Sequence, residues 1–223
     1  DSPKRFPAIC LAVSGGHTQL ILMKKVGDYK ILGETRDDAA GECFDKTARI
    51  LGLGYPGGPI ISKLAKESNV KREFSVKLPR PMIYQKNYDF SFSGLKTAVL
   101  YETRKAGKKT KSRKYLRGIS QEIQQAIIDV LIAKTIKAAK NFRTKSIIIG
   151  GGVAANEELR RQLEEKVKKE IPNSEFFIPN IEFCTDNAAM IGLTAFYHQG
   201  KNRVKNFQKI KAEANLKISH SPF

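Results

Sequence analysis

The chain has 223 residues, 41% of them hydrophobic, which is enough for one large domain or two small ones with a buried core. Lysine and arginine outnumber the acids by 40 to 22, and the net charge of +18 favours a polyanionic partner. No apolar run reaches the ~20 residues that span a bilayer, so the sequence excludes a membrane helix. The polar first residues predict no signal peptide, and three widely spaced cysteines indicate reduced thiols in a cytoplasmic protein.

Two apolar runs, residues 9–13 and 19–23, flank the segment SGGHT at residues 14–18. Two β-type runs joined by a Gly-Gly pair predict a hairpin, because both glycines take positive φ at little steric cost. Hydroxyl side chains beside bare backbone amides also suit a phosphate. The segment by itself indicates either a phosphate cradle or an ordinary tight turn.

The first half of the chain then predicts strands and helices in alternation. We expect a strand over 29–35 and a helix over 39–53, capped by Asp37 and Asp38 and ended by Gly54. The further elements are a rigid turn at 55–59, a short helix at 60–68, loops over 70–95 and a helix at 95–105.

A basic run follows, which we predict to be a loop. It contains no acid and indicates either nucleic-acid contact or a solvated lysine-rich surface. Its basic side chains are Arg104, Lys105, Lys108, Lys109, Lys111, Arg113, Lys114 and Arg117.

The second half predicts a long helix over 119–141, with Ile123, Ile127, Val130, Leu131 and Ala138 on its inner side. The remaining elements are a buried strand at 146–149, a helix at 156–170, a strand at 175–178 and a last helix at 188–198. We read residues 1–199 as one α/β unit and residues 200–223 as a basic irregular tail.

Four small-residue or polar turns lie at predicted strand or helix ends: residues 14–16, 55–59, 150–156 and 184–187. In open α/β sheets such turns converge on a ligand crevice. The triple glycine at 150–152 does not match GxGxxG, and no P-loop is present, so the sequence excludes a Rossmann site and a P-loop NTPase.

Six motifs occur in order over residues 8–196: residues 13–20, 37–46, 51–59, 90–97, 150–156 and 184–187. Together they resemble the bacterial TsaD/Gcp family, the tRNA adenosine threonylcarbamoyltransferases. The resemblance implies the ASKHA fold of actin, Hsp70 and the sugar kinases, with two lobes around a nucleotide cleft. The chain resembles the second lobe, a mixed central sheet flanked by helices, plus the crossing C-terminal helix. The first lobe is absent, so we expect an N-terminally truncated form that is inactive alone.

The resemblance also implies ligand-binding residues. The phosphate end of threonylcarbamoyl-AMP would lie at Ala12, Val13, Ser14, Gly15 and Gly16, and the adenine nucleotide would further contact Asp45, Gly58 and Asn156. From the residues alone, Asp45 could instead be a surface carboxylate paired with Lys46 or Arg49, Gly58 a plain turn glycine, and Asn156 a helix N-cap.

Asp186 is the metal ligand that the resemblance implies, and it could instead cap the last helix. Family members complete a site for one divalent metal, iron or zinc, with an HxxxH pair. This chain has only His17, His198 and His220, which do not form that pair. His17 has no base partner in the sequence, and no residue is a convincing covalent nucleophile, so catalytic residues stay unassigned.

The implied function is transfer of the threonylcarbamoyl group from threonylcarbamoyl-AMP to N6 of the adenosine next to the anticodon, in tRNAs that read codons starting with A. The implied partners are tRNA, drawn by the basic run, an inactive ASKHA-fold paralogue (TsaB-like) and a small ATPase (TsaE-like), with no membrane. The alternatives are a non-catalytic nucleotide- or RNA-binding lobe and an ASKHA phosphotransferase.

Overall fold

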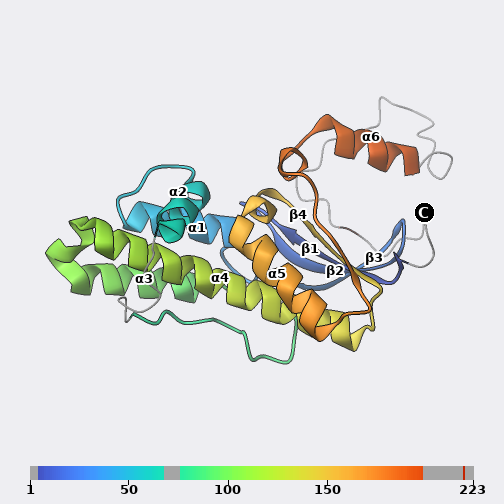
Figure 1. The fold of residues 1–223 in the computed structure, drawn as a ribbon, viewed down its shortest axis with the longest axis horizontal. Coiled ribbons are helices and arrows are strands. Elements are labelled where there is room, and N and C mark those ends of the chain that lie inside the picture. Colours follow the sequence, from blue (N-terminus) through green and yellow to red (C-terminus); the bar gives the residue numbers. More distant parts are fainter. Residues whose placement is uncertain (1–4, 68–75, 198–217, 219–223) are drawn as a thin grey trace.

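The computed structural model describes residues 5–67, 76–197 and 218, and a five-stranded mixed sheet lies at its centre (Figure 1). The order across the sheet is β3-β2-β1-β4-β5. The first three strands form an antiparallel meander, while β4 runs parallel to β1 and β5 parallel to β4. The strands are β1 (Ala8–Val13), β2 (Thr18–Lys25), β3 (Asp28–Glu34), β4 (Ser146–Gly150) and β5 (Glu175–Phe177).

Helices follow the meander and separate it from the two later strands. The α-helices are α1 (Ala40–Ile50), α2 (Gly57–Lys66), α3 (Ser93–Ala106), α4 (Arg113–Asn141), α5 (Glu157–Glu170) and α6 (Ala188–Tyr197). Short 3-10 turns are η2 (Gly107–Lys111), η3 (Gly152–Ala155) and η4 (Ile181–Phe183).

The core lies between the central strands and α4, which packs against β1. The predicted hairpin and the strand at 29–35 are confirmed to within a residue or two. The inner side predicted for the long helix is also confirmed, because all five of its named residues are fully buried. Hydrophobic spacing therefore located the central packing interface correctly.

The predicted capping of α1 by Asp37 and Asp38 is wrong. The hydroxyl of Thr18 accepts a hydrogen bond from the Ala40 N–H at 2.9 Å, so the hairpin supplies the first cap. The carboxylate of Glu42 accepts from the Ala39 N–H at 3.2 Å. The N–H groups of Ala39 and Ala40, which have no partner within the helix backbone, are therefore bonded to Glu42 and Thr18 and not to Asp37 or Asp38.

Asp37 caps a different helix. Its Oδ1 accepts from the backbone N–H groups of Phe92 at 2.8 Å and Ser93 at 3.1 Å, at the start of α3. Its Oδ2 accepts from the hydroxyls of Ser91 and Ser93. The aspartate therefore ties the segment before α1 to the segment before α3, a long-range contact that local sequence does not reveal.

Two further boundaries differ from expectation. α1 ends at Ile50, and the chain turns at Gly52 with a φ of +72°, ahead of the predicted end at Gly54. The basic run is not a loop: it forms the end of α3, the turn η2 and the first residues of α4. Lysine and arginine are good helix formers, which a reading based on charge alone overlooked.

α6 stands apart from the sheet and from the other helices (Figure 1). None of its residues is buried. Among the described residues, no helix combines the length and apolar composition needed to cross a bilayer. The predicted tail at 200–223 lies outside the described residues except for Ile218, and so do His198 and His220.

Candidate functional site

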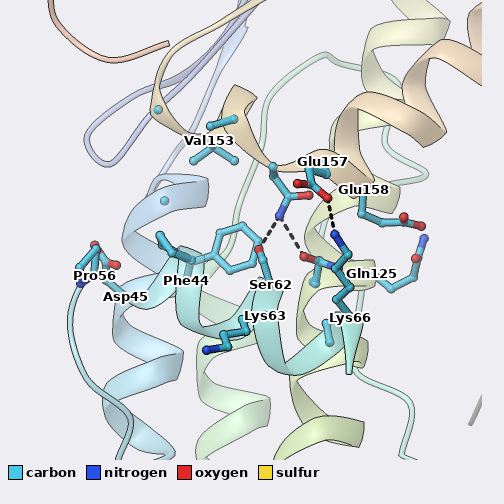
Figure 2. A pocket seen from close by; sticks show the side chains of 18 of the residues that line it. Phe44, Asp45, Pro56, Ser62, Lys63, Lys66, Gln125, Val153, Glu157 and Glu158 are labelled. Atoms are coloured by element: carbon cyan, nitrogen blue, oxygen red, sulfur yellow. Dashed lines mark hydrogen bonds and ion pairs between the residues drawn. The ribbon is translucent and has the colours of Figure 1, made fainter. Parts of the chain in front are cut away.

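A cleft of about 940 Å³ opens beside the ends of the parallel strands β1 and β4 (Figure 2). Its walls come from the β1–β2 turn, α1, α2, α4, η3 and α5. Ligands of open α/β sheets bind at the carboxyl ends of strands. The cleft brings together four of the residues predicted to bind nucleotide, namely Gly15, Asp45, Gly58 and Asn156.

The turn between β1 and β2 is closed by its own serine. The Ser14 hydroxyl oxygen accepts from the Gly16 N–H at 3.3 Å and from the His17 N–H at 3.0 Å, and the Ser14 N–H donates to the His17 carbonyl at 2.8 Å. A side chain at Gly15 or Gly16 would meet nothing within 4 Å. The glycines therefore border open space, and the Ser14 hydroxyl holds the turn closed.

Two predicted residues of the hairpin lie in the strand itself. Ala12 pairs with Gln19 and with Gly150, and the Val13 side chain is buried in the core. Of the five hairpin residues predicted to hold phosphate, the cleft wall in the described part of the chain includes Gly15 alone.

The first turn of α1 packs directly on the hairpin. The Gly41 N–H donates to the Ser14 carbonyl at 3.1 Å. A Cβ at Gly41 would lie 2.7 Å from that carbonyl oxygen and 2.8 Å from the Gly15 Cα, so only glycine fits. This contact places the N-terminus of α1 at the cleft.

Asp45 is half-buried on α1 and anchors the start of α2. Its Oδ1 accepts from the Gly57 N–H at 2.7 Å. It forms this bond in place of the predicted pairing with Lys46 or Arg49, since Lys46 binds Asp38 and Glu42. One carboxylate oxygen is thus fixed by a helix N-terminus while the side chain lines the cleft.

The triple glycine brings β4 close to β1. Gly151 has a φ of +95°, and a Cβ there would lie 2.4 Å from the Val13 carbonyl oxygen. Gly152 lines the cleft, with nothing within 4 Å of the place where its Cβ would stand. The missing side chain at Gly151 therefore allows the backbone to pack against Val13. The missing side chain at Gly152 leaves space in the cleft.

Asn156 caps α5, which confirms one of its two predicted roles. Its Oδ1 accepts from the Leu159 N–H at 2.9 Å. Its amide nitrogen donates to the Ser62 hydroxyl at 2.8 Å and to the Gln124 Oε1 at 2.9 Å. One side chain therefore joins α5, α2 and α4 at the cleft.

One ion pair crosses the cleft rim between α2 and α5, and two more lie within α5. Lys66 lies 2.9 Å from Glu157, and this hydrogen-bonded pairing raises the pKa of Lys66 and lowers that of Glu157. Arg161 pairs with Glu158 and with Glu165. The charges of these cations are therefore balanced by neighbouring acids.

Asp186 is exposed and does not cap α6. The neighbouring Asn187 caps this helix, since its Oδ1 accepts from the Met190 N–H at 3.0 Å. Within residues 5–67, 76–197 and 218, no three His, Cys, Asp or Glu side chains are grouped so that they could hold a metal ion. The described residues do not fit the metal that the resemblance implies.

Two of the three cysteines, Cys10 and Cys43, do not offer a nucleophile. Burial raises the pKa of Cys10 to about 12, and burial together with the charge of Asp38 raises that of Cys43 to about 12. Both thiols are therefore protonated at neutral pH, and a protonated thiol is a poor nucleophile. Cys184 is buried beside Arg160, whose guanidinium lies 2.9 Å from its sulfur.

The basic run divides into two groups. Arg113 and Arg117 both bind Glu67 at the end of α2, at 3.0 and 3.1 Å, and they lower the pKa of that carboxyl. The exposed group at the α3–α4 tip comprises Arg104, Lys105, Lys108, Lys109 and Lys111. Lys114 is also exposed, and Tyr101 next to the tip is 63% exposed.

Sequence reasoning missed Ser62 and Gln124. Gln124 stands among the inner-side residues of α4, one position after Ile123, and is almost completely buried. A polar side chain on an apolar helix face requires a hydrogen-bond partner, so its position was a usable signal. Ser62 lies one helical turn after Gly58, on the same face of α2.

Comparisons with known proteins show which family the chain resembles. The family model for tRNA N6-adenosine threonylcarbamoyltransferase (TsaD) matches residues 1–193. A protein of that name from Thermosipho africanus is 48% identical over 95% of this chain and 62% of its own length. Proteins of the same name from Geobacillus kaustophilus and Clostridium botulinum are 48% and 46% identical, over 88% and 95% of this chain. The chain spans only 56% and 60% of their lengths.

Proposed function

The chain belongs to the tRNA N6-adenosine threonylcarbamoyltransferase family, and from that membership we propose that its cleft holds the adenylate of threonylcarbamoyl-AMP. The protein transfers the threonylcarbamoyl group to N6 of the adenosine next to the anticodon, in tRNAs that read codons starting with A. One observation carries the proposal: first-turn residues of three helices, Gly41, Gly58 and Glu157, line the same cleft. Helix dipoles attract anions to helix N-termini, even where an N–H group such as that of Gly41 already has a protein partner.

Different residues of the cleft bind the phosphate and the ribose of the nucleotide. The phosphate lies at the helix N-termini and the open hairpin glycines, and Asp45 accepts hydrogen bonds from the ribose hydroxyls. Gly58 supports this arrangement, since a Cβ there would find its nearest neighbour, the Phe44 Cβ, at 3.9 Å, which leaves the backbone accessible.

The transfer itself needs no enzyme-bound intermediate. The adenosine N6 attacks the carbamoyl carbonyl, the carbonyl C–O bond to the phosphate breaks, AMP leaves, and N6 releases a proton to solvent. The protonated state of the buried Cys10 and Cys43 supports direct transfer. In the described part of the chain, no three His, Cys, Asp or Glu side chains lie together around one possible metal position. We therefore propose Asp186 as one ligand of a divalent metal and assign no second ligand.

The sheet is one lobe of an ASKHA fold. The order β3-β2-β1-β4-β5, with an antiparallel meander followed by two parallel strands, supports this assignment. The partners we propose are tRNA, an inactive ASKHA-fold paralogue and a small ATPase, and the site of action is the cytoplasm. The exposed basic residues at the α3–α4 tip contact the tRNA, and their positive charge supports this role.

The direct test uses the full-length gene product. It is incubated with tRNA, threonine, bicarbonate, ATP and the partner proteins, and the tRNA nucleosides are analysed by mass spectrometry. Threonylcarbamoyladenosine is the expected product, and its absence under conditions where a relative produces it would refute the proposal.

A second candidate function is a non-catalytic lobe that binds nucleotide. The cleft favours it, because first-turn residues of three helices line a site that suits a nucleotide without a catalytic side chain. It predicts AMP binding by this chain without any transfer activity of the full-length protein.

A further inference from the structure

The tip between α3 and α4 carries an exposed aromatic side chain beside its cations. Figure 1 shows α3 and α4 meeting at η2, at the end of the molecule that lies away from the sheet. Tyr101 is 63% exposed and lies one helical turn before Arg104 and Lys105 on α3. Side chains three and four positions apart on a helix are neighbours, with about 5–6 Å between their Cβ atoms. The ring and these two cations therefore share one face of α3.

We propose that Tyr101 stacks on an unpaired base of RNA, while the cations of the tip bind the phosphates on either side of that base. The inference rests on the proposed contact between the tip and tRNA, and it adds what the tip recognises there. A cation binds phosphates of a duplex and of a single strand alike. An exposed ring, by contrast, stacks only on a base whose face is uncovered.

The ring of Tyr101 is accessible because its neighbours on the other side are small. They are Thr97 and Ala98, four and three positions earlier on α3. The Thr97 hydroxyl donates to the Ser93 carbonyl at 2.9 Å, so it is turned toward the helix backbone. Tyr101 forms no hydrogen bond and no ring contact with any other described residue. A stacked base would therefore remove the ring from water without displacing a protein contact.

The cations of the tip are also available to a ligand. Arg113 and Arg117, where α4 begins, are held by Glu67. A cation without such an acid can neutralise a phosphate and release the counterions bound there. Among the described residues, the exposed cations that pair with no acid are Arg104, Lys105, Lys108, Lys109 and Lys111.

Substitutions of one residue separate the ring from the charge. Tyr101→Leu removes the ring but keeps an apolar side chain and the net charge. Its tRNA binding should weaken by about five- to 150-fold, the range for the loss of one stacked base, with an unchanged salt slope. Tyr101→Phe keeps the ring and should bind within about twofold of the original affinity. Filter binding over a salt series, with the chain of 223 residues, measures both quantities.

Tyr84→Leu is the matched control for the loss of an exposed tyrosine. Tyr84 is 96% exposed but lies beside the C-terminal half of α4, where Lys137 donates to the Gln85 carbonyl. Its replacement leaves tRNA binding unchanged. A short RNA duplex without loops is the second probe. Its base faces are covered, so Tyr101→Leu binds it as tightly as the unchanged chain does.

A tryptophan at the same position reports stacking directly. The chain contains no tryptophan, so Tyr101→Trp supplies a single indole fluorophore at the tip. Single-stranded oligoadenylate should quench its emission until the site is saturated, because the indole stacks on an adenine. A duplex of the same length should leave the emission unchanged.

Other outcomes overturn the inference in separate ways. Equal tRNA affinity of Tyr101→Leu and the unchanged chain would mean that the ring does not contact RNA, and it would leave the proposed charge contact of the tip intact. Equal weakening on tRNA and on the duplex would mean that the ring packs on the RNA backbone and not on a base. If the unchanged chain binds no RNA, the proposed contact between the tip and tRNA fails, and this inference fails with it.

Discussion

Gly57 and Gly58 are adjacent in sequence but meet opposite surroundings at the start of α2. A Cβ at Gly57 would lie 2.6 Å from the Ala48 Cβ and 2.7 Å from the Phe44 carbonyl oxygen. At Gly58 the nearest atom would be 3.9 Å away. The first glycine serves helix packing, and the second keeps the cleft open.

This difference predicts opposite effects of the same substitution. Gly57→Ala destabilises the fold by about 1–3 kcal/mol, the usual cost of overpacking. Gly58→Ala leaves stability within about 0.5 kcal/mol, as is typical of sites without steric conflict, but weakens AMP binding. Urea unfolding and calorimetric titration measure the two effects, and equal stability of both variants would contradict the packing argument.

Asp38 gives stability a dependence on pH. Burial alone would raise its pKa, but hydrogen bonds and charge from Lys46 and Lys96 bring the pKa below its ordinary value. The folded state therefore favours the carboxylate. The stabilisation is complete well above the unfolded pKa of about 3.9 and is lost as pH falls through the lower folded pKa.

Asp38→Asn should consequently destabilise the protein at pH 7, with a difference from the unchanged chain that shrinks below about pH 4. Urea unfolding at several pH values measures it, and Asp28→Asn at the start of β3 is the control. A difference that stays constant down to pH 3 would show that the charge of Asp38 is irrelevant to stability.

At the residue scale, sequence motifs found Gly15, Asp45, Gly58 and Asn156, which all reach the cleft. They did not find Gln124, because its role depends on α5 arriving beside α4. They also misassigned Asp37, whose partners Phe92 and Ser93 lie more than fifty residues away. Local patterns predict which residues are special, while tertiary contacts decide what each one binds.

Among the α-helices in the described part of the chain, α6 differs from the others because it buries none of its residues. Its large apolar side chains are exposed, Ile191 by 64% and Phe196 by 62%. Apolar area that stays in water contributes nothing to the stability of the chain.

Ile191→Ser should therefore leave the free energy of unfolding within about 0.5 kcal/mol of the original value. Ile127→Ala on α4, a fully buried position, should cost about 2–5 kcal/mol and serves as the comparison. Thermal and urea unfolding measure both variants. A comparable loss in Ile191→Ser would mean that α6 packs on the rest of the chain.

Periodic elements were predictable, whereas the boundaries of some helices, such as the end of α1 and the start of α4, were not. The inner side of α4 follows from helical spacing of apolar residues, and β4 from an uninterrupted apolar run. The start of α4 at Arg113 escaped prediction because a charged run was taken for a loop. Its arginines are held by Glu67 on α2, an interaction that requires the folded arrangement.

For the whole molecule, the net charge of +18 predicts RNA binding that weakens steeply with salt. Replacing Lys108, Lys109 and Lys111 by Gln should flatten the dependence of log K on log salt by up to about 0.9 for each phosphate that is no longer neutralised. Filter binding of tRNA over a salt series measures the slope. Arg113→Gln, at a residue bound to Glu67, should change the slope less, and equal slopes for all variants would exclude the tip as the tRNA-binding surface.

The central claim is that the cleft between α1, α2, α4 and α5 binds an adenine nucleotide. The most direct measurement is an NMR titration of the isotopically labelled chain with AMP, followed through its backbone amide signals. The account predicts that the amides of Gly15, Gly58, Gly152 and Asn156 shift together and saturate with one affinity. Saturable shifts confined to other surfaces, or no shifts at any AMP concentration, would contradict it.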